Sequence, residues 1–98
     1  MPVQGESEVV GRLQRALVAF QKALGLLLTA HRRVKGLSAV EAEQFWMAQG
    51  NRIEQHLHAT AVEVVASFRA FSAVGLVASA DDRPLVNAAQ RHLTGGGR

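Results

Sequence analysis

The chain of 98 residues contains no cysteine and no tyrosine, and aromatic residues make up only 5% of it. Without cysteine it can form no disulfide framework and no thiolate zinc site, and it has no thiol nucleophile. Alanine, leucine and valine supply most of the apolar content, which favours helices packed through small side chains over a β-sandwich. We therefore expect a small all-α protein.

Long apolar runs are also absent. The strongest apolar stretch, residues 24–28, is bracketed by Lys22 and by His31, Arg32 and Arg33, so it falls far short of the roughly 18 residues that a membrane span needs. The polar first residues do not show the basic and then apolar segments of a secretory leader. Together with the lack of cysteine, these features predict a cytoplasmic protein with no membrane partner.

Acidic residues are missing from positions 9–40, although the net charge of the whole chain is only +3. This stretch contains six basic residues, which we identify as candidate nucleic-acid-binding residues: Arg12, Arg15, Lys22, Arg32, Arg33 and Lys35. A cationic ridge on one helix could meet several phosphates of a nucleic-acid backbone. The alternative is an ordinary solvated helix face.

A long first helix is predicted from about Ser7 to Val34. Its apolar positions alternate in steps of three and four residues, the heptad pattern of a helix seam: Val10, Leu13, Leu17, Phe20, Leu24, Leu27, His31 and Val34. A flanking row of small or apolar residues repeats every seven positions: Val9, Ala16, Ala23 and Ala30. The seam predicts the core-facing stripe of a bundle, with a dimerising coiled coil as the alternative.

Gly36 suits a left-handed residue after the first helix, and Ser38 with Glu41 matches a capping box that opens a second helix to about Gln49. At Gly50 we expect a break or kink, with Asn51 capping a third helix. One helix running through Gly50 is the alternative.

The third helix is expected over residues 52–80, and a short fourth helix over residues 84–93 after a turn capped by Asp81 or Asp82. Residues 1–6 and 94–98 are expected to be flexible, which leaves 7–93 as a single helical domain. The expected fold is thus a helical bundle with two long helices in a hairpin-like arrangement plus one or two short helices.

Three large apolar residues stand together at Phe45, Trp46 and Met47, and they cannot all face one core from one helix. With Leu17, Phe20 and Leu24 of the seam, they are our candidate protein-interface residues.

The pair Trp46 and Gly50 resembles the Trp-x-Gly turn of helical-hairpin substrates of type VII secretion, which implies a helical hairpin that binds a partner. Here three residues separate the pair instead of one, and the tyrosine of that family's export signal is missing.

The histidines offer weaker signals. Glu54 and His58 are four residues apart, but a metal site would need a third ligand from His31 or His92, so we expect no metal and no cofactor. Arg52 and His58 resemble the loose Arg-to-His spacing of one class of helical ribonucleases. Two common residues at a permissive distance do not make a catalytic site, and we expect no enzyme.

These features predict a non-catalytic small subunit of a larger (ribo)nucleoprotein assembly, which binds nucleic-acid backbone through the basic first helix and protein through apolar helix faces. In size, charge and lack of motifs the chain resembles the small helical subunits of RNA-guided effector complexes. The alternative is a purely protein-binding bundle: a homodimer, a chaperone or a type VII-like secreted hairpin.

Overall fold

The computed structural model describes the backbone of residues 2–95 and the side chains of residues 5–95. It is an all-α bundle, as predicted, and no strand occurs in these residues. The elements are α1 (Pro2–Lys35), α2 (Ala39–Phe45), the π-helical turn η1 (Trp46–Gly50), α3 (Asn51–Ala73) and α4 (Arg83–Thr94).

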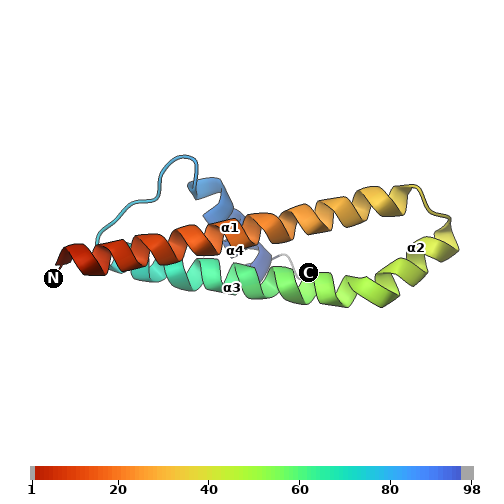
Figure 1. The fold of residues 1–98 in the computed structure, drawn as a ribbon, viewed down its shortest axis with the longest axis horizontal. Helices are drawn as coiled ribbons and strands as arrows, with labels where there is room; N and C mark the ends of the chain where they lie inside the picture. The colour runs from red at the N-terminus through yellow and green to blue at the C-terminus, as the bar shows by residue number, and fades with distance from the viewer. Residues whose placement is uncertain (1, 96–98) are drawn as a thin grey trace.

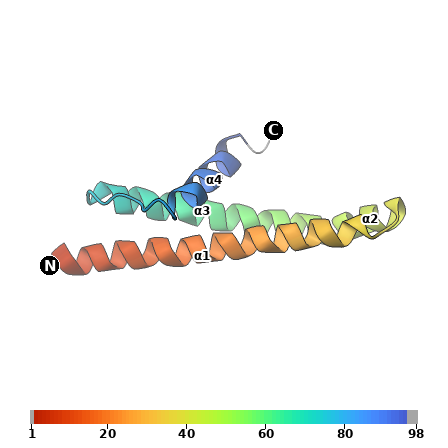
Figure 2. The ribbon, with the colours of Figure 1, turned by 90° about the horizontal axis from the view of Figure 1, so that it is seen from above.

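The two long arms form a hairpin. Figures 1 and 2 show α1 running antiparallel to α3, with α2 bending back towards the end of α1 and α4 lying across the pair. The molecule is a rod with extents of 57 × 22 × 22 Å. We call the end formed by the last turns of α1, α2 and η1 the tip.

The ends of the chain differ in part from the prediction. Helix α1 begins at Pro2, five residues before the expected start at Ser7. Thr94 is the last residue of α4 and does not belong to a tail. Met1 and residues 96–98 lie outside the described residues, so the flexibility expected there stays a prediction.

The turn after α1 follows the predicted boundary. Backbone bonds from Gly36 to Arg33 and from Leu37 to Val34 close the helix. The Ser38–Glu41 capping box is confirmed, because each side chain accepts a hydrogen bond from the other residue's backbone N–H. The left-handed conformation expected at Gly36 is wrong: among the described residues, Gly75 is the glycine with a positive φ.

Of the break or kink expected at Gly50, the break is wrong, because a π turn continues the helix there. Gly50 and Asn51 both have right-handed helical dihedrals, and the chain stays helical from Ala39 to Ala73. No side-chain hydrogen bond caps α3 at this point, so the predicted cap at Asn51 is wrong. The indole of Trp46 lies over Gly50, where an added Cβ would meet the ring at 3.3 Å. The missing side chain thus makes room for the ring while the helix continues.

Helix α3 ends at Ala73, seven residues before the predicted end at Ala80. Gly75 takes a φ of 86°, and backbone bonds from Gly75 to Ser72 and from Leu76 to Phe71 complete a Schellman motif. The chain then crosses to α4 in a loop that keeps Ala78 buried. The apolar spacing predicted a longer helix because it does not register this left-handed stop.

Asp82 precedes α4 as predicted, and Pro84 lies in its first turn. The Asp82 carboxylate makes no cap, however, and instead accepts a hydrogen bond at 3.0 Å from the Gln14 side chain of α1. The hydroxyl of Ser79 accepts the Asp82 backbone N–H. Asp82 therefore connects α4 to α1 of the hairpin and does not cap α4.

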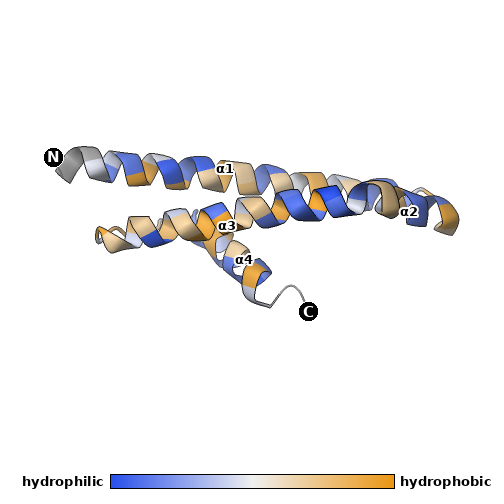
Figure 3. Ribbon diagram, turned by 90° about the horizontal axis from the view of Figure 1, so that it is seen from below, coloured by the Kyte–Doolittle hydropathy of each residue, from blue (hydrophilic) through white to orange (hydrophobic). Residues whose placement is uncertain are grey.

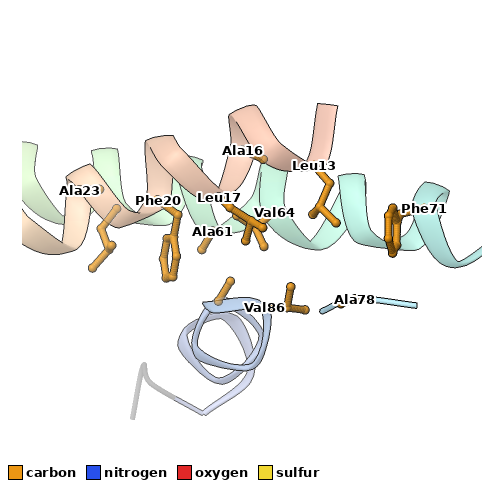
Figure 4. Close-up of a cluster of buried hydrophobic side chains, with 12 residues drawn as sticks. Leu13, Ala16, Leu17, Phe20, Ala23, Ala61, Val64, Phe71, Ala78 and Val86 are labelled. Atoms are coloured by element: carbon orange, nitrogen blue, oxygen red, sulfur yellow. The ribbon is translucent and has the colours of Figure 1, made fainter. Parts of the chain in front are cut away.

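The core lies where α4 crosses the hairpin (Figure 4). Its buried members come from α1, α3, the loop and α4: Leu13, Ala16, Leu17, Phe20, Ala23, Leu57, Ala61, Val64, Phe71, Ala78, Val86 and Ala89. The predicted core-facing stripe of α1 is confirmed in its middle, with the alanine row buried as deeply as the leucines. Val10, the first residue of the predicted seam, and His31, the last but one, are exposed.

This packing corrects two predicted interface residues. Leu17 and Phe20 are only 3% and 1% exposed, because α3 and α4 of the same chain cover them. They cannot be reached by a partner in the folded protein. Leu24 is half-buried beside the same core.

Towards the tip, apolar side chains are less well covered by neighbouring helices. Figure 3 shows hydrophobic residues at the end of the rod furthest from the N-terminus, beyond the part that α4 covers. Four apolar side chains are exposed there: Leu26, Leu28, Val40 and Met47. The core therefore holds the middle of the hairpin, and the tip is left for other contacts.

Candidate functional site

The six predicted cationic residues of α1 do not form one ridge. Arg15, Lys22 and Arg33 are separated by seven and eleven residues, which brings all three to the same side of a helix with 3.6 residues per turn. Arg32 is turned about 100° and Lys35 about 200° from Arg33 around the helix. All five side chains are exposed.

The sixth residue, Arg12, is held in an ion pair. Its guanidinium donates from Nε and Nη2 to the two carboxylate oxygens of Glu63 on α3, at 2.8 and 3.2 Å. The buried hydroxyl of Ser67 donates to the same carboxylate at 3.0 Å. The hydrogen bond from Arg12, with that from Ser67, lowers the pKa of Glu63, and the bond to Glu63 raises the pKa of Arg12. Arg12 thus links α1 to α3 and is not a free phosphate ligand.

A groove of about 440 Å³ opens beside Arg33, between α1 and the α2–η1–α3 arm. We call it the tip groove; its lining residues are Ala23, Leu26, Thr29, Ala30, Arg33, Phe45, Gln49, Arg52, Ile53 and His56. Its floor is mostly apolar, and no acidic residue lines it. Because Arg52 of α3 lines the same groove as Arg33, it lies on the same side of the hairpin as Arg15, Lys22 and Arg33. We call these four cations the basic face.

The register of the hairpin places the cations at both ends of the groove. The rings of His31 and Trp46 have centroids 5.1 Å apart and therefore lie at the same level. Arg33 is two residues beyond His31 towards the turn, and Arg52 is six residues beyond Trp46 away from the turn. At 1.5 Å per residue, the two arginines are about 12 Å apart along the hairpin.

The three consecutive apolar residues near the tip have separate roles. Phe45 lines the tip groove and meets Trp46 edge to face, with ring centroids 5.3 Å apart. Trp46 faces a second, smaller groove that it shares with Leu27, His31 and Glu54. Met47 is 78% exposed and touches neither groove. The expectation that the three could not share one core is confirmed.

The histidines are spread over different surfaces. The rings of His58 and His92 lie 5.9 Å apart, between α3 and α4, whereas His56 lines the tip groove with Arg52. Within the described part of the chain, no three metal-ligating side chains come together. Arg52 and His58 point to different sides of α3, so the spacing that resembles ribonucleases does not assemble a site.

Sequence reasoning missed that Arg52, His56 and Leu26 belong to the same surface as Arg33. Part of the signal was present, since Arg52 and His56 are four residues apart and therefore lie on one side of α3. The shared surface was not predicted, because a break at Gly50 would have placed Phe45 and Arg52 on unrelated helices.

No family model, curated protein or solved structure matches the chain. None of the helices in residues 2–95 has the length and apolar character needed to cross a membrane.

Proposed function

We propose that this protein is a non-catalytic helical subunit of a nucleoprotein assembly, and that it binds the backbone of nucleic acid through the basic face. The observation that carries this proposal is that no acidic side chain within residues 5–95 pairs with the positive charges of that face. Among the described side chains, the one ion pair within 4 Å joins Arg12 to Glu63. Arg15, Lys22, Arg33 and Arg52 are exposed on one side of the hairpin and take part in no such pair, which leaves their cationic groups to an external anion.

The dimensions suit a polyanion. Arg15 and Arg33 are eighteen residues apart, which corresponds to about 27 Å along α1. A nucleic-acid strand presents a phosphate at every nucleotide over such a distance, and each neutralised phosphate releases condensed counterions. Three of the four cations are arginines, whose planar forks suit phosphate oxygens. Since no side chain of this face forms a base-reading motif, the contacts are to the backbone. The lack of cysteine suits a reducing compartment, so we place this assembly in the cytoplasm.

The test is binding of fluorescently labelled oligonucleotides, single-stranded and duplex, measured by anisotropy across a salt series. Four phosphate contacts predict that log Kobs falls against log salt with a slope of about −3 to −4. The double variant Arg15→Ala/Lys22→Ala should reduce the slope to about −2. The matched control is Arg32→Ala/Lys35→Ala, which removes the same charge from outside the basic face and should leave the larger slope nearly unchanged.

Equal loss in the two double variants would show that only net charge matters and would refute the assignment to this face. If no oligonucleotide binds even at low salt, the nucleic-acid proposal fails altogether.

The second candidate function is protein binding at the tip. It rests on the exposed apolar side chains Leu28, Val40 and Met47, which the chain's own core does not use. A contact through them would be nearly independent of salt, in contrast to backbone binding. Light scattering on the same samples gives the mass, and a dimer that Leu28→Asp returns to a monomer would favour this function.

A further inference from the structure

The tip groove has a chemical character that backbone binding alone does not use. Between its cationic ends, the surface is formed by Leu26, Ala30, Phe45 and Ile53. Leu26 is 56% exposed although it belongs to the most apolar segment of α1. The groove lies where α1 and the facing arm separate towards the tip, beside the π turn (Figure 1).

The pattern of charge limits which ligand fits. An apolar surface lies between Arg33 at one end and Arg52 with His56 at the other, and no carboxylate lines the groove. The complementary ligand carries a flat or apolar group between two anionic groups. A single strand of nucleic acid has this pattern, with bases between successive phosphates. In a duplex the bases are stacked and paired, so their faces cannot reach the side chain of Phe45 or Leu26.

We infer that the tip groove binds a short unpaired stretch of nucleic acid, with a base lying against Phe45 and Leu26 and with flanking phosphates at Arg33 and Arg52. The inference rests on the proposed function and specifies its substrate as single-stranded. Aromatic side chains inside a cationic groove are the common means of holding unpaired bases without reading their sequence. An acidic amphipathic helix also complements such a groove. The strand fits better, because Lys22 and Arg15 continue the cationic row beyond the groove, where further phosphates would follow.

The experiment compares three probes of equal length with the full chain: oligo-dT, the same strand paired with oligo-dA, and an abasic strand that keeps the sugar and phosphate but has no bases. Oligo-dT should bind about fivefold or more tightly than the abasic strand, as expected for one stacked base. The duplex should bind through the basic face only and should resemble the abasic strand.

Two pairs of exposed residues supply matched variants. Leu26→Gln removes apolar surface from the groove, and Leu28→Gln makes the same change on a residue that is 57% exposed and outside the groove. Neither variant changes the charge. Leu26→Gln should weaken oligo-dT about fivefold while leaving duplex binding unchanged, and Leu28→Gln should weaken neither. Arg33→Ala compared with Arg32→Ala tests the phosphate contact in the same way.

The outcomes separate this inference from the proposed function. If the abasic strand binds as tightly as oligo-dT, or if the two glutamine variants behave alike, the groove takes no base, while the salt-dependent backbone contact stands. If no strand binds at all, both proposals fall. Binding of an acidic amphipathic peptide that is sensitive to Leu26→Gln, in the absence of strand binding, would assign the groove to protein instead.

Discussion

Leucine residues of α1 that look equivalent in the heptad pattern should differ widely in their contribution to stability. Leu17 and Leu24 both belong to the predicted seam, but Leu17 is 3% exposed inside the core and Leu24 lies half-buried at the edge of it. Leu28 lies outside the seam and is 57% exposed. Truncation to alanine at these three sites therefore measures where the core ends.

The expected magnitude for Leu17→Ala follows from its burial. The change removes three carbon atoms from a site without solvent, which costs about 2.4 kcal/mol in transfer free energy at about 0.8 kcal/mol per carbon. The cavity left between α1, α3 and α4 adds to this cost, because the surrounding helices relax only in part, and the total is about 3–5 kcal/mol. That is a large fraction of the roughly 5–15 kcal/mol that stabilises a domain of this size.

Leu24→Ala should cost about half as much, since part of its surface already faces water. Leu28→Ala should change the free energy of unfolding by less than about 0.5 kcal/mol, as is usual for exposed sites. Urea unfolding followed by circular dichroism measures all three. With a slope of about 1–3 kcal/mol per molar urea, Leu17→Ala should lower the midpoint by at least about 1 M.

The reasoning is refuted if Leu24→Ala costs as much as Leu17→Ala. That result would mean that the whole seam is buried against a second copy of the chain, as in a dimerising coiled coil, and a concentration-dependent midpoint would accompany it.

Four further variants have expected outcomes. Gly75→Ala should destabilise the protein by about 1–2 kcal/mol in urea unfolding, because φ at Gly75 is 86°, whereas Gly25→Ala, at an uncrowded helical site, should stabilise it by about 0.4–1 kcal/mol. Ser38→Ala should cost about 1 kcal/mol in the same assay through loss of the capping box. The lowered pKa of Glu63 means that its contribution to stability is present above the ordinary value of 4.5 and is lost as the pH falls through the folded-state pKa, so the stability difference between the native chain and Glu63→Gln should vanish in acid. Glu63→Gln also releases Arg12, which should steepen the salt slope of nucleic-acid binding by about 1.

The helices themselves could be predicted because their signals are local. The capping box at Ser38 and the apolar stripe of α1 depend on residues within a few turns of each other, and both are confirmed. The stop at Gly75 was missed for a physical reason. A glycine inside an apolar pattern is compatible both with a continuing helix and with a left-handed end, and only the contacts of the following loop decide between them.

The candidate site was less predictable, because it depends on which residues of two distant helices share a side. Arg12 and Arg15 look alike in the sequence, but the partner of Arg12 is 51 residues away and is revealed only by the packing of α1 on α3. Arg52 joins the basic face because the chain stays helical through Gly50. The π turn adds one residue to the helix, which rotates the side chains of α2 by about 100° around the helix axis relative to those of α3. The tip groove therefore depends on a feature that the apolar periodicity of the sequence does not specify.

The position of α4 explains why the tip groove and the exposed apolar side chains beside it lie at the tip. Its twelve residues span about 18 Å, so it covers only the middle of a 57 Å rod. Beyond it, the hairpin has two helices and no third layer, which leaves apolar side chains such as Leu26 without cover. Because these side chains contribute little to the core, they can be replaced without unfolding the chain. The same arrangement that makes the tip a weak part of the fold leaves its surface uncovered, and on the proposed function the arginines at the ends of the groove would select an anionic partner.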